Sequence, residues 1–312
     1  MSTEATETDV TGIDPTEVVR RFNRSYTQRV GALQENFHGT GLSLAAVRVL
    51  FEVGATGSGG VTVRDLRERL GLDSGYLSRI FTRLTEEGLA TVVADRVDGR
   101  RRRVHVTRKG RVTLGMIDER SDAVARALVE PLSPRQQERL LDALQTAGLL
   151  VRAATVELVE LSPDHPRARE ALDAYCAELH ARFPTGFDPG PMSADDVASL
   201  RSPEGVFVVA VSDGAAVACG GVRRLDPETL EIKRMWVDAS WRGAGMGSRL
   251  LRRLEDEAAR LGGSRVVLDT NRTLTEAMAM YERAGYRETA GYDVGNPYAE
   301  AWFEKPLSDR KG

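Results

Sequence analysis

The chain contains few of the residues that build disulfides and metal sites. Only two cysteines, Cys176 and Cys219, and four histidines occur in its 312 residues. The cysteines lack the short spacing of a redox or zinc pair, and the histidines form no HExxH pattern. The sequence therefore predicts two buried thiols and no metal site.

Long hydrophobic runs are also absent. Runs such as VFVVAV at 206–211 are far shorter than the roughly 20 apolar residues that a membrane-spanning helix needs. The first residues, MSTEATETDVTG, have neither the basic start nor the apolar stretch of a secretory signal. We therefore expect a cytoplasmic protein without a membrane partner, and a disordered tail at residues 1–13.

Lysine is scarce as well, so arginine carries nearly all the positive charge. The net charge is −3, yet residues 61–111 contain 13 Lys and Arg against 7 Asp and Glu. This local excess of about six positive charges favours an anionic partner for that segment.

The length of the chain and a change of pattern predict two domains. Composition is that of a globular protein, with 41% hydrophobic and 29% charged residues. Helical patterns dominate up to the linker LSPDHPRA, after which strands and helices alternate. We expect a mainly helical domain at 14–160 and an α/β domain at 168–308.

The first half opens with two predicted helices. Residues 14–38 have Asp14 as a possible N-cap, a proline directly after it, and apolar residues at helical spacing. A second helix, SLAAVRVLFEVG at 43–54, ends at a glycine-rich loop.

A predicted helix-turn-helix follows at 61–89, with Gly71 in the turn. The second helix places apolar residues on one face and arginine, threonine and serine on the other. Such a polar face can enter a major groove, although a solvated charged face shows the same pattern.

The next segment favours the DNA-binding interpretation. Two β-prone runs flank Asp98-Gly99, a strong hairpin signal, and arginines crowd the tip. A basic hairpin beside a recognition helix is typical of a wing that contacts phosphate and the minor groove. The predicted DNA-binding residues are Ser74, Ser78, Arg79, Thr82, Arg83, Arg96, Arg100, Arg101 and Arg102.

These features resemble the MarR family of winged helix-turn-helix regulators over about residues 14–155. The wing matches a DxxDGRR pattern at Asp95, Asp98, Gly99, Arg100 and Arg101, and VHVTRKG follows it. The resemblance implies double-stranded DNA as a partner. It also implies a homodimer held by the first helix and by helices near 109–130 and 134–155.

In the second half, a glycine loop at 242–247 lies between the strand LEIKRMWV and the helix SRLLRRLEDEAARL. Successive backbone N–H groups at a helix N-terminus can bind phosphate. The spacing excludes a Rossmann fingerprint, because the sixth position from Gly243 is Ser248, and it excludes a Walker A loop, because no Gly-Lys-Ser/Thr occurs.

The remaining pattern, RxxGxG after a strand, resembles the pyrophosphate loop of GNAT acetyltransferases. VVLDTN and LTEAMAMYERAGY resemble the rest of that cofactor-binding core, and the resemblance runs from about 168 to 307. It implies a GNAT acyltransferase fold with a mixed sheet and acetyl-CoA as cofactor. The expected cofactor-binding residues are Trp236, Val237, Arg242, Gly243, Ala244, Gly245, Met246, Gly247, Ser248 and Asn271. Asn271 could instead cap the helix after it.

Two residues match the catalytic positions of the GNAT family. An attacking amine must lose a proton, and Glu231 matches the family's general base. The departing thiolate must gain one, and Tyr281 matches the general acid. Glu231 could also be a salt-bridge partner of Lys233 or Arg234, and Tyr281 a core tyrosine.

The aromatic residues Phe183, Phe187, Tyr292, Tyr298 and Trp302 are candidates for a substrate pocket, although such residues are as often part of a core. The sequence favours a DNA-binding regulator fused to an N-acetyltransferase that acts on a small amine. Two alternatives remain: a ligand-sensing regulator that binds acetyl-CoA without turnover, and an enzyme that acetylates other proteins.

Overall fold

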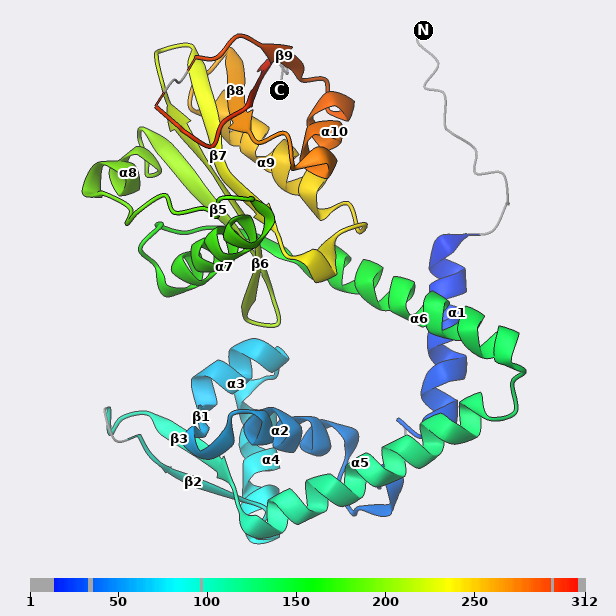
Figure 1. Cartoon of the computed structure of the whole chain (residues 1–312). Helices are drawn as coiled ribbons and strands as arrows, with labels where there is room; N and C mark the ends of the chain where they lie inside the picture. The colour runs from blue at the N-terminus through cyan, green and yellow to red at the C-terminus, as the bar shows by residue number, and fades with distance from the viewer. Residues whose placement is uncertain (1–13, 33–35, 96–97, 293–294, 308–312) are drawn as a thin grey trace, which may run out of the picture. The chain divides into compact units, whose positions relative to one another are not determined.

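The computed structural model describes residues 14–32, 36–95, 98–292 and 295–307 (Figure 1). The predicted tail at 1–13 and Arg96 lie outside these ranges. The chain divides into two compact units, residues 1–140 and 141–312. Among the described residues no helix is both long enough and apolar enough to cross a membrane.

The first unit is mainly helical, as predicted. Its helices are α1 (Pro15–Arg29), α2 (Leu44–Ala55), α3 (Val63–Leu70), α4 (Ser74–Glu86), α5 (Arg108–Val129) and the start of α6 (Pro134–Thr155). Side chains of Asp14, Ser43 and Asp73 cap the first turns of α1, α2 and α4. The first helix is shorter than the predicted 14–38, because Gly31 follows it in a left-handed conformation with φ 69°.

Three short strands complete the winged helix-turn-helix. They are β1 (Val61–Thr62), β2 (Ala90–Ala94) and β3 (Arg102–Val106), in the order β1-β3-β2. The antiparallel pair β2–β3 is the predicted wing hairpin. Its base joins a core in which Leu50, Leu77, Leu84 and Val104 are at most 1% exposed. The apolar face predicted for α4 is therefore the buried one.

The second unit is built on a seven-stranded sheet in the order β4-β5-β6-β7-β8-β10-β9. Its strands are β4 (Glu157–Glu160), β5 (Gly205–Ser212), β6 (Ala215–Arg224), β7 (Thr229–Val237), β8 (Arg265–Thr270), β9 (Arg287–Thr289) and β10 (Ala301–Pro306). Only the β7–β8 pair is parallel, so the predicted mixed sheet is confirmed. The sequence did not predict β4, which pairs with β5.

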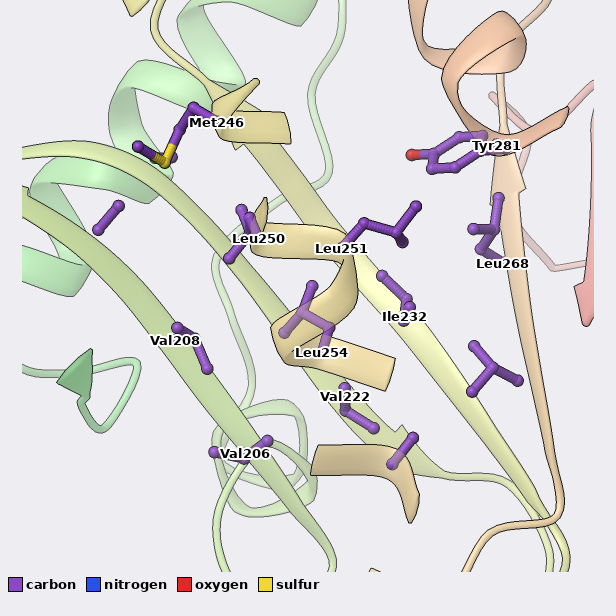
Figure 2. Packing of buried hydrophobic residues seen from close by; sticks show 14 of the residues in the cluster. Val206, Val208, Val222, Ile232, Met246, Leu250, Leu251, Leu254, Leu268 and Tyr281 are labelled. Atoms are coloured by element: carbon purple, nitrogen blue, oxygen red, sulfur yellow. The ribbon is translucent and has the colours of Figure 1, made fainter. Parts of the chain in front are cut away.

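Helices cover both faces of this sheet (Figure 1). On one face lie α9 (Met246–Arg260) and α10 (Thr275–Arg283), and on the other α7 (Pro166–Arg182) and the short α8 (Ala194–Ser199). Figure 2 shows Leu250, Leu251 and Leu254 of α9 directed at the sheet, where Val222 and Ile232 are buried. Burying each leucine contributes about 1.5–3 kcal/mol, which anchors the start of α9 firmly over β7.

From Leu141 on, α6 belongs to the second unit, and its last turn packs beside α9. Arg249 of α9 donates hydrogen bonds to the backbone oxygens of Ala153 at 2.8 Å and Val156 at 2.9 Å. Carbonyl groups at a helix C-terminus have no partner within the helix, so an arginine is a favourable cap.

Candidate functional site

Strands β7 and β8 separate at the centre of the second sheet. Their pairing runs from Thr229 with Arg265 to Ile232 with Leu268 and stops there. β7 continues to Val237 along β6, through an irregularity in register at which Arg234 has a φ of 56°. Residues 233–237 therefore present a backbone edge that does not pair with β8.

The glycine loop follows directly and opens α9. Gly243 and Gly245 have φ values of 82° and 75°, conformations that only glycine adopts without strain. Gly245 is the N-cap and makes no side-chain capping bond. The first backbone bond into the helix comes from the N–H of Arg249 to Gly245 O. The N–H groups of residues 246–248 are thus left for an external acceptor such as phosphate.

A hollow of about 230 Å³ lies beside this helix start, between α9 and α10. It is lined by Ser248, Arg252, Arg283 and Lys305, among others. Lys305 pairs with Glu255 at 2.8 Å, whereas Arg252 and Arg283 form no ion pair within the described ranges. The hollow therefore places these two arginines close to the uncapped N-terminus of α9.

Glu231, the predicted general base, lies on the opposite face of β7 and is 0% exposed. Its carboxylate contacts Arg223 Nε at 2.5 Å and Lys233 Nζ at 3.1 Å, and accepts a hydrogen bond from Tyr292 Oη at 3.0 Å. The salt bridge to Lys233 was one interpretation of this residue, and it is present. Both carboxylate oxygens already have partners. An amine could therefore pass a proton to Glu231 only through one of these partners, or after displacing one.

Lys233 extends the network across the point where the two strands separate. Its Nζ lies 3.1 Å from Asp269 Oδ2 on β8, and that oxygen accepts a 2.8 Å hydrogen bond from Asn296 Nδ2. Two carboxylates thus share one ammonium group, which reduces the cost of burying all three.

Tyr281, the predicted general acid, lies on α10 within the core over which α9 packs (Figure 2). It is 6% exposed, and its ring centroid is 5.9 Å from that of Tyr286 and 5.9 Å from that of Phe303. Burial raises the pKa of its phenol above the ordinary value of 10.0, so the group is protonated at neutral pH. In Figure 2 its hydroxyl points away from Leu268 and β8.

The other predicted cofactor-binding residues lie at or just after the ends of β7 and β8, where the two strands separate. Trp236 and Val237 form the end of β7, and the indole N–H of Trp236 donates to Glu178 Oε2 at 2.9 Å. Asn271 donates to Tyr298 O at 3.0 Å and accepts from the N–H of Thr273 at 2.9 Å. The capping interpretation of Asn271 is wrong, since the N-cap of α10 is Leu274.

The five aromatic pocket candidates form separate groups. Phe187 packs with Phe183 and Tyr298, at centroid distances of 5.8 and 4.7 Å. Tyr292 instead contacts Glu231 and lines a hollow of about 540 Å³ at the start of β7 and β8. Trp302 lies on β10. Its ring packs against Gly291, where an added Cβ atom would be only 3.3 Å from the ring. No single aromatic pocket contains all five.

In the first unit, the predicted recognition helix exposes its polar residues. Ser74, Ser78, Arg79, Thr82 and Arg83 are all exposed on α4. Arg79 lies 5.6 Å above the ring of the exposed Tyr76, whereas Arg83 is bound to Glu87 at 3.0 Å and to the backbone oxygen of Gly41.

The arginines of the wing differ in their contacts: one is part of the structure of the wing, and the others are exposed. Arg103 pairs with the buried Asp95 at 2.7 Å and donates to the backbone oxygens of Gly59 and Gly60. The exposed arginines at the tip are the predicted Arg100, Arg101 and Arg102. Arg103 therefore fixes the base of the wing, whereas Arg100, Arg101 and Arg102 stay exposed, with Arg101 in a 3.1 Å ion pair with Asp98.

Sequence reasoning missed several residues that the fold brings to these sites, among them Tyr76, Glu178, Arg223, Asp269 and Asn296. Strand alternation could have placed Asp269 on the face opposite Leu268. The neighbouring Arg182 gave no hint of the role of Glu178, because Trp236 and Arg242 lie 58 and 64 residues away in the chain.

In comparisons with known proteins, the two regions of the chain match two different families. Residues 172–286 match the acetyltransferase (GNAT) family, and residues 40–101 match the MarR family. The chain is 36% identical to the IAA acetyltransferase of Azospirillum brasilense over 144 residues, 44% of this chain and 87% of that protein. It is 36% identical to N-alpha-acetyltransferase RimI of Mycobacterium tuberculosis over 115 residues, 36% of this chain and 70% of that protein.

Among solved structures, a MarR-family transcriptional regulator from Rhodococcus sp. RHA1 covers 44% of this chain and 96% of its own, with a TM-score of 0.36 and 22% identity. The match over residues 172–286 and the two acetyltransferase relatives show that the chain belongs to the GNAT acetyltransferase family, and residues 40–101 of its first half match the MarR family.

Proposed function

We propose that this chain is a DNA-binding transcriptional regulator whose second domain transfers the acetyl group of acetyl-CoA to a small amine. The proposed domains are residues 14–160 and 168–308. One observation carries the enzymatic part: an unpaired edge of β7 leads directly into a glycine loop and an uncapped helix start.

Acetyl-CoA fits this arrangement in three places. The N–H groups of residues 246–248 bind the pyrophosphate, and the hollow with Arg252 and Arg283 receives the remaining phosphate. The amide groups of the pantetheine arm pair with the β7 edge near Trp236 and Val237, as a further strand would. A backbone N–H on that edge then polarises the thioester carbonyl.

The chemistry uses groups on both faces of the sheet. The amine nitrogen attacks the thioester carbon and gives up a proton to the network around Glu231 and Asp269. The C–S bond breaks, and the departing sulfur takes a proton from the phenol of Tyr281. The phenol is protonated at neutral pH, as a proton donor must be.

The DNA-binding part rests on the exposed polar face of α4 and on the wing. Arg79 and its neighbours read bases in the major groove, while Arg100, Arg101 and Arg102 contact phosphate. Apolar side chains that are exposed on α1, α5 and α6 support a homodimer; they include Val18, Phe22, Tyr26, Val112, Met116, Leu141 and Leu144.

Two measurements test the proposal. Release of free CoA is followed with acetyl-CoA and a panel of small amines, with acetyl-CoA binding measured by calorimetry. Binding without turnover would favour the ligand-sensing alternative, whereas absence of binding would refute the cofactor assignment. Gel-shift titration against genomic fragments tests DNA recognition separately.

A further inference from the structure

We propose that Glu178 on α7 is a positioning residue for acetyl-CoA, holding the end of β7 and the glycine loop in their binding geometry. The inference rests on the proposed use of acetyl-CoA and adds a residue that lies on the opposite face of the sheet from α9. Glu178 itself is not proposed to touch the cofactor.

A single carboxylate joins two segments of the proposed cofactor site. Glu178 Oε2 accepts the indole N–H of Trp236 at 2.9 Å, and Oε1 pairs with the guanidinium of Arg242. Trp236 is the penultimate residue of β7, and Arg242 is the first residue of the glycine loop. The two segments that would contact the thioester arm and the pyrophosphate are thus tied to the same side chain.

Arg242 is committed to this contact. Its Nη2 pairs with Glu178 and also donates to Val237 O, the last carbonyl of β7, at 3.2 Å. The guanidinium therefore closes the loop back onto the strand. Phosphate binding is left to the backbone N–H groups at the start of α9, whose directions depend on how the loop is held.

The carboxylate of Glu178 is also linked, through Arg182, to α10, which follows β8 in the chain. Arg182 lies 3.3 Å from Glu178 Oε1 and 2.9 Å from Glu276 Oε2, in the first turn of α10. The hydrogen bond to Glu276 raises the pKa of Arg182, and that of Glu276 is lowered in return, so both groups stay charged. Glu178 thus lies between the β7 end and α10, which carries Tyr281.

The energetic contribution of this cluster is to orientation rather than to folding. The side chains of Glu178 and Arg242 are 22% and 41% exposed, and ion pairs in such surroundings add little stability. The helix α7 is held independently by the buried Ala168, Ala171, Leu172 and Leu179. Removal of the carboxylate should therefore leave the fold intact and disturb the site.

The test compares Glu178→Ala and Glu178→Gln with Glu170→Ala, an exposed glutamate on the same helix. Calorimetry with acetyl-CoA should give a Kd about tenfold higher for the alanine variant, since a charge-assisted contact is lost at each segment. Glutamine still accepts from Trp236 but has no charge for Arg242, so its Kd should be intermediate. Glu170→Ala should bind as the parent does.

Kinetics and a second substitution separate positioning from a structural role. In Glu178→Ala the KM for acetyl-CoA should rise while kcat at saturation and the melting temperature change little. Arg242→Ala should raise the Kd less in that background than in the parent, because the two side chains share one contact. If the parent binds acetyl-CoA and Glu178→Ala binds it equally well, the inference fails. If the parent does not bind, the proposed function itself fails.

Discussion

The two proposed anion-binding surfaces of this chain are built from different atoms. In the first unit, positive charge is carried by exposed arginine side chains on α4 and the wing. In the second, backbone N–H groups behind two left-handed glycines supply the donors. A long polyanion can be bound by many independent charges, whereas one pyrophosphate needs a few donors in a defined geometry.

Because of this difference, we expect side chains to have different roles in the two units. In the wing, each arginine can be removed singly with a limited effect, because its neighbours remain. In the proposed site of the second unit, the backbone would hold the cofactor, which leaves buried side chains such as Tyr281 for the reaction. Four substitutions test this division, from the largest expected effect to the smallest.

The largest effect is expected for Tyr281→Phe. Loss of the proton donor should lower kcat by about 100-fold or more, with the Kd for acetyl-CoA nearly unchanged. Tyr286→Phe, which removes a neighbouring buried hydroxyl, is the matched control and should retain turnover. If Tyr281→Phe has the same kcat as the parent, Tyr281 is a core residue and not the proton donor.

Arg79→Ala should reduce discrimination between an operator and unrelated DNA by about 1–3 kcal/mol, because a base contact is lost. Competition gel shifts measure this ratio at constant salt. Arg48→Ala removes an exposed arginine from α2 and should leave the ratio unchanged. Equal loss of discrimination in both variants would argue against α4 as the recognition helix.

Gly245→Ala and Gly262→Ala form a matched pair of substitutions just outside the two ends of α9. Both glycines have positive φ, 75° and 86°, and open space where a Cβ would be added. Each alanine should destabilise the fold by about 1–2 kcal/mol through backbone strain. Only Gly245→Ala should also weaken acetyl-CoA binding, by about tenfold, since it changes the loop. Thermal unfolding and calorimetry separate the two effects, and equal affinities would argue against a geometric site.

The smallest effect is expected for Arg101→Ala in the wing. Losing one phosphate contact should lower the slope of log Kd against log salt by about 0.9, equally for operator and unrelated DNA. Fluorescence titration from low to physiological salt measures this slope. A sequence-dependent loss would instead place Arg101 against base edges.

Local sequence signals predicted much of the fold. The cap at Asp14, the Asp98-Gly99 wing and the loop at 242–247 all appear where they were expected. These signals are reliable because the groups that satisfy each one lie within a few residues. The same locality explains one error: the apolar pattern beyond Arg29 predicted a longer first helix, but Gly31 ends it.

Contacts over long distances in the chain were not predictable in this way. The burial of Glu231 depends on Tyr292, 61 residues away, and on Arg223, opposite it on β6. The aromatic candidates were chosen by residue type, and the fold distributes them among separate sites. Residue type reports what a side chain can do, whereas packing decides which partner it meets.

The sequence by itself determined the order of most elements, the position of the glycine loop at 242–247 and the basic character of residues 61–111, because each is encoded in neighbouring residues. Only the tertiary structure decided that β7 and β8 separate after Ile232, that Glu231 is enclosed by cations, and that Glu178 joins Trp236 to Arg242. These features arise where distant segments meet, since strand pairing and helix packing create contacts that no local pattern contains.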